Sequence, residues 1–507
     1  MELNTDTWPY ILKKSKEIFK EEPALELAIG PVVKDAIKAA AKSEIYYFFM
    51  KQILPYWYSF KKILKIKGYF KFNKIFKKTY LENTLKDAKD RKYCVLSIDN
   101  TRDNNYGLLF PILKKIDQKG ENSILFTYYN VYESKKGEIN SLKNNSIVFF
   151  ENLLDNINKK EIIRKKTKAK KLYKKYIQNL KDDKITDFVK KHKNQIIFRL
   201  EQLLVFSETI SRIFENRELK FIFSWGGYFP LAIAGSKHGI RTVMIQHGNF
   251  GNVTNPKEYG QVPPECSPNA SNEIITWGEH PKKQVQHLFN YSSNDKIYAL
   301  GNPQHDKYVE VLNDKNIRDI NEILNLDSKK KNVIFFSATP VINVGQLLER
   351  WVKPIYALNE LYERLHSKIN LIIKLHPHEG KKYYEKYMKN IDKVTIIKNE
   401  VSIYELMKKT DIAMSLSSTT TLEAMIFQIP TLQLILSEHG VRGECYYKYG
   451  AAILISSADE LINTVEKIIS GTYDLSELKM NQKKYLEKNS SNLGNATNKI
   501  VEHLLKK

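Results

Sequence analysis

The sequence predicts an α/β protein built from two doubly wound parallel sheets, and three observations lead to this fold class. Short apolar runs typical of buried strands alternate with helical patterns from residue 91 onward. The chain has 507 residues, enough for two substantial domains, and 42% of them are hydrophobic, which excludes wholesale disorder. Polar stretches rich in His, Ser and Thr follow several of these runs, at the edge where open α/β sheets bind ligands.

The chain divides into successive predicted segments. Residues 1–90 carry helical patterns without a strand–turn–helix rhythm, so we expect a helical accessory segment packed on the first α/β domain. Residues 91–303 predict a Rossmann-like N-terminal domain, interrupted by a helical insertion at 151–218. Residues 304–490 predict a second Rossmann-like domain, and residues 491–507 a last helix that crosses back to the first.

The first α/β domain is expected to open with a strand at residues 92–98. A helix over residues 110–119 follows, with Pro111 tolerated in its first turn, and residues 123–127 predict the next strand. This βαβ opening suits a doubly wound sheet. It lacks the glycine spacing of a dinucleotide-binding fingerprint, so the sequence does not support an NAD site.

The insertion carries an apolar stripe at helical spacing. Largely apolar residues recur there at three- and four-residue steps, namely Ile196, Leu200, Leu203, Ser207, Ile210 and Phe214. Sustained heptads are absent, so we expect a hairpin packed against the domain rather than a coiled-coil dimer.

A histidine follows an expected strand of the first domain. Residues 242–245 predict this strand, and Gln246, His247 and Gly248 come directly after it. An imidazole at this edge can accept a proton from a hydroxyl or donate a hydrogen bond to a phosphate. The alternative is a structural histidine hydrogen-bonded to its loop. We expect Gln246 and Gly248 to line the same site.

A second histidine follows a strand of the second domain. The apolar run 370–375 ends in His376, and Pro377 biases His376 away from helix, which places its imidazole at the end of a parallel strand. An imidazole held there can donate a hydrogen bond to a phosphoryl oxygen. The neighbouring strand, residues 332–337, leads into a loop in which Thr339 can also face phosphates.

The strongest motif is a run of hydroxyl residues that opens a helix. The apolar strand at 412–416 is followed by five Ser or Thr residues, 417–421, and then by Glu423 one turn inside the helix. Helix starts of this kind offer hydroxyl and N–H donors to an anion such as phosphate. A carboxylate one turn further on suits ribose hydroxyls. The alternative is a helix start with surplus capping residues.

The net charge of +24 is unevenly distributed. Residues 61–80 hold eight lysines and no acid, and residues 159–176 hold ten Lys or Arg against Glu161 alone. Such basic segments predict either an anionic membrane surface, at about 1 kcal/mol per charge, or a solvated helix face. No nucleic-acid motif accompanies the charge, so nucleic-acid binding is not expected.

The chain lacks the marks of secretion. Its first residues are acidic and polar, and the apolar stretch 45–60 is interrupted by Lys51 and Gln52, so neither a signal peptide nor a membrane span is expected. The three cysteines are far apart, which favours a reducing compartment. We expect a cytoplasmic protein that lies on the inner face of the plasma membrane if the basic segments bind it.

These motifs, in this order, resemble nucleotide-sugar glycosyltransferases of the GT-B fold. The likeness is to the capsule and teichoic-acid branch, which includes CDP-glycerol glycerophosphotransferases and polysialyl- and Kdo-type transferases. It covers residues 219–505 well and 92–130 loosely, and it implies a cleft between an acceptor domain and a nucleotide-donor domain. The residues it implies for the donor site are His376, Ser417, Ser418, Thr419 and Glu423, with Thr339 added from its loop.

The resemblance predicts transfer of a sugar or polyol phosphate from a nucleotide-activated donor to a cell-surface polysaccharide or glycolipid. His247 is then the expected base or positioning residue, with Asp99, Asp103 and Glu258 as weaker candidates for the base. No metal-binding acidic motif stands at a strand end, so metal-independent chemistry without a cofactor is expected. The two-acid motif of polysialyltransferases is absent, which argues against that subfamily.

Two alternatives stay open. UDP-sugar 2-epimerases look similar and also place a helix glutamate on the ribose, but we interpret their arginine-bearing phosphate motif as missing after the first strand. The other alternative is a non-catalytic scaffold that binds nucleotide and membrane during polysaccharide assembly.

Overall fold

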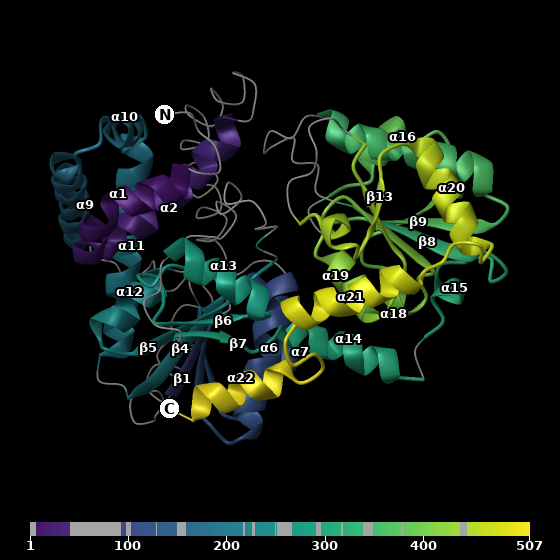
Figure 1. Cartoon of the computed structure of the whole chain (residues 1–507). Helices are drawn as coiled ribbons and strands as arrows, with labels where there is room; N and C mark the ends of the chain where they lie inside the picture. Colours follow the sequence, from purple (N-terminus) through teal and green to yellow (C-terminus); the bar gives the residue numbers. More distant parts are fainter. Residues whose placement is uncertain are drawn as a thin grey trace.

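The computed structural model contains two α/β domains and a separate body of helices (Figure 1). The prediction of two doubly wound, Rossmann-like domains with additional helical segments is confirmed. The structure describes residues 7–40, 93–97, 103–127, 129–149, 159–215, 218–225, 229–248, 250, 266–289, 296–315, 318–337, 348–376, 379–436 and 444–506.

The first domain is built on a parallel sheet with the order β3-β2-β1-β4-β5-β6-β7 among the described strands. The order reverses between β1 and β4, which is the switch point of a doubly wound sheet. The strands are β1 Tyr93–Ser97, β2 Ser123–Thr127, β3 Asn145–Phe149, β4 Leu219–Trp225, β5 Arg241–Ile245, β6 Glu273–Thr276 and β7 Ile297–Ala299.

Helices cover this sheet on both faces, and the first of them corrects a prediction. The helices are α6 Asp103–Gln118, α7 Tyr129–Asn140, α12 Phe229–Lys237 and α13 Glu279–Phe289. Helix α6 begins at Asp103, so Pro111 lies inside it and not in its first turn. Pro111 lacks a backbone N–H and so leaves one helical hydrogen bond unmade. The burial of Leu108 and Leu109, which precede it, offsets this loss and favours the longer helix.

The second domain repeats the plan with the strand order β10-β9-β8-β11-β12-β13 among the described residues. Its strands are β8 Lys331–Phe336, β9 Ile369–Lys374, β10 Thr395–Ile397, β11 Ile412–Ser415, β12 Thr431–Leu434 and β13 Ile453–Ile455. Its helices are α15 Ile320–Ile323, α16 Leu348–Leu365, α17 Lys382–Tyr387, α18 Ile403–Lys408, α19 Thr420–Ile426, α20 Ala458–Ile469 and α21 Ser476–Asn489.

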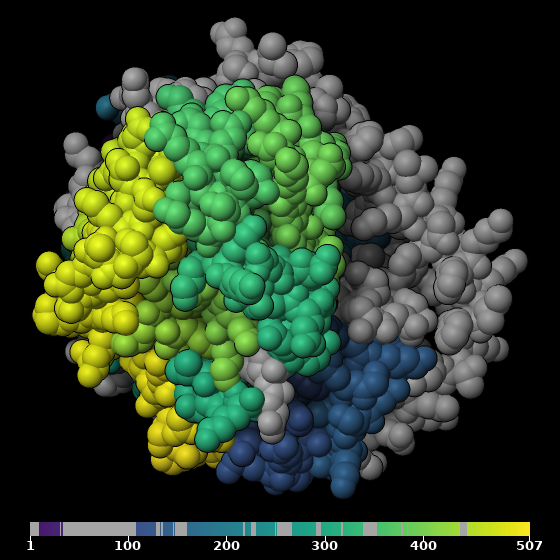
Figure 2. Space-filling view, turned by 90° about the vertical axis from the view of Figure 1, so that its right-hand side faces the viewer, coloured from purple at the N-terminus to yellow at the C-terminus, as the bar shows by residue number. Residues whose placement is uncertain are grey.

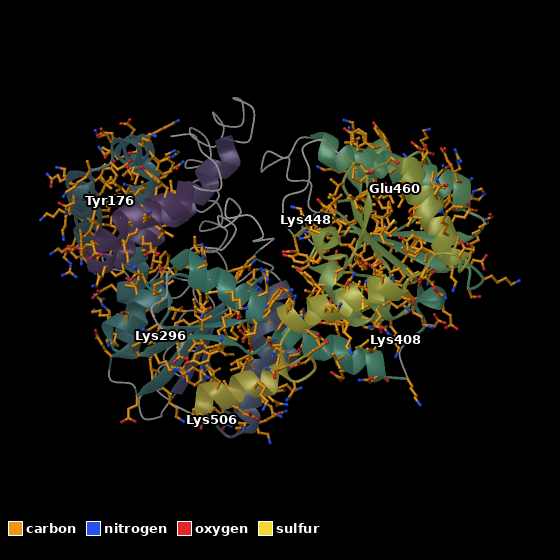
Figure 3. The ribbon with its side chains drawn as sticks, viewed as in Figure 1. Tyr176, Lys296, Lys408, Lys448, Glu460 and Lys506 are labelled. Atoms are coloured by element: carbon orange, nitrogen blue, oxygen red, sulfur yellow. The ribbon has the colours of Figure 1, made fainter. Side chains whose placement is uncertain are left out.

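The helical body joins the N-terminal segment to the insertion. It consists of α1 Thr7–Glu21, α2 Pro23–Ala40, α9 Lys159–Asn179, α10 Asp183–Lys191 and α11 Lys193–Phe214. Their buried side chains form one apolar core, in which Phe19 of α1 stacks on Tyr176 of α9. Figure 3 labels Tyr176 within this body. The predicted stripe on α11 is buried, from Ile196 to Phe214. The N-terminal helices therefore pack on the insertion, and α11 also contacts α12 of the first domain.

Helix α9 carries the basic segment 159–176, and its aromatic residues face inward. Tyr173 and Tyr176 are buried in the helical body, so their rings are not available to insert into a membrane. Its buried Lys165 pairs with Glu208 at 2.9 Å. Segment 61–80 lies outside the described residues. Among the described helices, none combines the length and the apolar composition of a membrane span.

Two helices connect the domains. Helix α14, Pro303–Asn313, follows the first sheet, and helix α22, Ala496–Leu505, returns to pack on α6. Figure 2 shows this junction from the side, with teal residues between the yellow C-terminal and the blue first-domain residues. Asp306 of α14 accepts hydrogen bonds from the backbone N–H groups of Ala496 (2.9 Å) and Thr497 (2.7 Å), which ties the two connections together.

Candidate functional site

Sheet register brings the two predicted nucleotide segments of the second domain to one edge. Strand β8 lies between β9 and β11, with Phe336 paired to Lys374 on one side and to Ser415 on the other. His376 follows β9 and Ser417 follows β11, so they flank the end of β8 two strand spacings apart, roughly 10 Å. This is the carboxyl edge beside the point where the strand order reverses, the usual ligand position in such sheets.

The backbone at His376 is held by a buried carboxylate. The His376 N–H donates to Ser337 Oγ at 3.0 Å and to Glu379 Oε2 at 3.2 Å, and the Ser337 hydroxyl donates to the same Glu379 oxygen. Glu379 is 2% exposed, and Lys398 Nζ donates to its backbone carbonyl at 2.9 Å. The turn therefore presents a partly exposed His376 from a fixed backbone. Sequence reasoning missed the role of Glu379, although it stands only three residues after His376.

The hydroxyl run at the start of α19 has two functions in the structure. Ser418 Oγ accepts from the Thr420 N–H at 3.2 Å, and Thr421 Oγ1 lies 2.6 Å from Ser415 Oγ. These two side chains stabilise the strand-to-helix turn. Thr419, the N-cap residue, has helical backbone angles and makes no side-chain capping bond. Ser417 and Thr419 are partly exposed, so the arrangement combines structural capping with hydroxyls near the sheet edge.

Glu423 is partly exposed and is joined to the helix that links the domains. The Tyr308 hydroxyl of α14 donates to Glu423 Oε2 at 2.6 Å. Burial raises the pKa of Glu423 to about 7, while the hydrogen bond from Tyr308 acts to lower it. Tyr404 of α18 lies against Tyr308, with 4.5 Å between ring centroids. No local pattern announces Tyr308, because it is 115 residues away from Glu423 in sequence.

The motif after β5 is divided between structural and exposed residues. Gln246 is fully buried: its Nε2 donates to the Gly248 carbonyl at 3.0 Å, and its Oε1 accepts from the Trp277 N–H at 2.8 Å. Gly248 has a φ of +73°, which favours glycine. His247 is exposed at the end of the strand. The roles predicted for Gln246, His247 and Gly248 in binding or catalysis stay predictions.

The remaining candidate residues from the sequence are not described in the structure, or are described only in their backbone. Asp99, Glu258 and Thr339 lie outside the described residues, and Asp103 begins α6 with a side chain that is not described. Their proposed roles therefore also stay predictions.

Comparison with known proteins identifies the fold. A family model described as UDP-N-acetylglucosamine 2-epimerase matches residues 279–505, somewhat less than half of the chain. Solved 2-epimerases match too. The Neisseria meningitidis enzyme bound to UDP-GlcNAc has a TM-score of 0.52 at 16% identity, over 82% of this chain and 99% of its own. The Methanocaldococcus jannaschii enzyme in complex with UDP-GlcNAc and UDP has a TM-score of 0.50 at 17% identity, over the same shares.

A third structure, a putative UDP-N-acetylglucosamine 2-epimerase from Listeria monocytogenes, has a TM-score of 0.51 at 11% identity, over 82% of this chain and 97% of its own. The fold is the GT-B-like fold of UDP-GlcNAc 2-epimerases. No curated protein matches the chain. At these identities the likeness to the solved structures concerns the fold.

These findings correct the predicted activity. The family model is that of an isomerase, and the structures just described are epimerases, which contradicts the prediction of a glycosyltransferase and with it a polysaccharide acceptor. The specific likeness to CDP-glycerol and polysialyl transferases is not confirmed. The residues that the resemblance implied for the donor site, among them His376 and Ser417, all lie in the second domain.

One objection to an epimerase also fails on the sequence itself. That objection rests on the absence of an arginine-bearing motif after the first strand. Arg102 nevertheless follows the end of β1 at Ser97 by five residues. Arg102 lies outside the described residues. Because an arginine does follow the first strand, its supposed absence is no argument against an epimerase.

Proposed function

We propose that this protein is a nucleotide-sugar epimerase that inverts C2 of UDP-N-acetylglucosamine or a closely related UDP-sugar. The observation that carries this proposal is the match of residues 279–505 to the 2-epimerase family model. That range includes both segments at the β9–β8–β11 edge, His376 and the run from Ser417 to Glu423. A cluster of donors and one carboxylate there suits a nucleoside diphosphate.

The second domain would hold the nucleotide. His376 and the hydroxyls of Ser417 and Thr419 are donors for the phosphate oxygens, with Ser418 stabilising their turn. Glu423 accepts hydrogen bonds from the ribose hydroxyls. Thr339, in the loop after β8, is a further candidate for a phosphate contact.

The first domain would supply the groups that act on the sugar. Inversion at C2 requires a proton to leave from one face and return on the other. The electron pair of the C2–H bond can form a C1–C2 double bond as UDP leaves C1, and UDP adds back to C1 as the proton returns to C2, so an acid–base group on each face serves the reaction. His247 is our candidate for one, and Asp103 or Glu258 for the other. Arg102 adds a permanent positive charge after β1, suited to the diphosphate because a guanidinium binds phosphate oxygens in pairs.

The deciding experiment uses purified protein with UDP-GlcNAc in deuterated water, followed by proton NMR. We expect the C2 epimer to accumulate, with deuterium entering at C2. His247→Ala should slow both signals by about 10²–10⁴-fold while UDP still binds. Release of UDP without any epimer, or no change in the sugar at all, would refute the proposed reaction.

We also propose that the basic face of α9 lies against an anionic membrane surface through charge alone. This face comprises Lys168, Lys171 and Lys174, which are exposed at helical spacing. Among the described residues, none of the three has an acidic partner within ion-pair distance. Lysines near an anionic surface contribute about 1 kcal/mol each.

A further inference from the structure

Tyr308 is a buried tyrosine on the helix that links the domains, and its hydroxyl reaches the candidate nucleotide site. The side chain is 3% exposed. Its ring packs against Tyr404 of α18 at 4.5 Å between centroids, and the ring of Phe427 meets it edge to face at 6.1 Å. Because the ring is packed on these sides, its hydroxyl is held in place, 2.6 Å from Glu423 Oε2.

The other oxygen of Glu423 is left open by this arrangement. Within the described part of the chain, Tyr308 is the one donor that bonds this carboxylate, and the Glu423 side chain is partly exposed. With Oε2 held, rotation of the carboxylate is restricted and Oε1 keeps a defined direction. A carboxylate oxygen in a defined direction is a good acceptor for neighbouring hydroxyl groups.

We propose that Tyr308 is a positioning residue for the nucleotide, which orients the Glu423 carboxylate so that Oε1 accepts from the ribose hydroxyls of a nucleoside diphosphate. This inference rests on the proposed function, since that function places the ribose at Glu423. Tyr308 acts through Glu423 and does not itself touch the nucleotide. The linker helix α14 thereby contributes to binding in the second domain.

The charge of Glu423 gives this role a pH signature. Burial raises the pKa of Glu423 to about 7, and the Tyr308 hydrogen bond lowers it. Tyr308 is the titratable group that acts on the pKa of Glu423. The pKa values of Tyr308 and of the neighbouring Tyr404 are both raised, by burial first, so both phenols stay neutral near pH 7. No cation among the described residues contributes. Without the Tyr308 hydroxyl the pKa of Glu423 rises, and a larger fraction is protonated at neutral pH.

The test compares UDP with 2′,3′-dideoxy-UDP, which lacks the ribose hydroxyls, by titration calorimetry from about pH 6 to about pH 9. Tyr308→Phe keeps the packed ring and removes the hydroxyl. We expect this variant to bind UDP about ten-fold more weakly than the wild type at pH 7, and the difference in affinity to be smaller near about pH 9. It should bind the dideoxy nucleotide as tightly as the wild type does. Tyr404→Phe changes a second phenol in the same cluster and should bind UDP normally.

A double-mutant cycle separates positioning from folding. In a Glu423→Gln background, Tyr308→Phe should have no further effect on UDP affinity, because the carboxylate it orients is gone. Equal losses for UDP and dideoxy-UDP would overturn the inference, since they would show a purely structural role. Normal UDP affinity in Tyr308→Phe, with a loss in Glu423→Gln, would overturn it and leave the proposed function standing. If the wild type binds no UDP, the proposed function falls first, and this inference with it.

Discussion

Glu273→Gln should loosen the C-terminal helix from the first domain. Arg241 of β5 donates through Nε and Nη2 to the two Glu273 oxygens, both at 2.7 Å, and through Nη1 to the Leu504 carbonyl at 3.0 Å. His503 Nε2 lies 2.8 Å from Glu273 Oε2. The Arg241 and Glu273 side chains are 15% and 10% exposed. The glutamine side chain keeps the shape of the carboxylate but carries no negative charge. It therefore leaves the charge of the largely buried Arg241 side chain without its carboxylate partner.

The magnitude follows from the pKa of Glu273. Burial acts to raise it, but hydrogen bonds from His503 and Arg241 and their charges outweigh burial and lower it from 4.5 to about 2. That depression corresponds to about 3 kcal/mol of folding free energy, close to the loss measured when buried pairs are broken. Because the folded-state pKa is depressed, this stabilisation is complete above about pH 4.5 and is lost as the pH falls toward about 2.

Hydrogen exchange of the α22 amides is the appropriate assay, because it reports local opening. We expect exchange about a hundred-fold faster in Glu273→Gln at neutral pH, and a difference that shrinks in acid. Glu405→Gln is the matched control: Arg318 binds Glu405 with the same two-bond geometry, at 2.7 and 2.9 Å, but the Arg318 side chain is 66% exposed. It should change stability little. Equal effects of the two substitutions would refute the reasoning from burial.

Three further predictions test the site, the junction and the surface. His376→Ala should weaken UDP binding roughly ten-fold, whereas replacement of the exposed His366, which directly follows α16, should not. Equal UDP affinities of the two variants in calorimetry would exclude His376 as a phosphate partner. Gly301→Ala should lower the unfolding midpoint more than Gly239→Ala, although both glycines have positive φ. A Cβ on Gly301 would lie 2.2 Å from the backbone oxygen of Ser491, whereas a Cβ on Gly239 meets open space. Replacing the three lysines of the basic face with glutamine should reduce co-sedimentation with anionic vesicles at low salt, and an unchanged bound fraction would show that this face is merely solvated.

Much of the second domain could be predicted from the patterns of its strands. A parallel strand buried on both faces is a short apolar run, and its carboxyl end is where polar residues can meet a ligand. His376 after β9 and Ser417 after β11 were both recognised in this way. The register then shows that β8 lies between them, which sequence alone does not reveal.

The reaction could not be inferred from the same motifs. His376, Ser417 and Glu423 belong to the half of the molecule expected to bind a nucleotide, and binding a nucleoside diphosphate makes the same chemical demand whether a sugar is transferred or inverted. The groups that distinguish the two reactions act on the sugar, and the comparisons rather than the motifs favoured an epimerase.

The sequence by itself determined the α/β class, the apolar faces of the helices and the edge of the second sheet that carries polar residues, because each of these follows from local periodicity. Only the tertiary structure decided which distant side chains meet. Tyr308 reaches Glu423, Glu379 holds the backbone of His376, and Arg241 joins β5 to the last helix. A hydrogen bond depends on a few ångströms and on direction, and these are set by the packing of whole elements, not by residues adjacent in the chain.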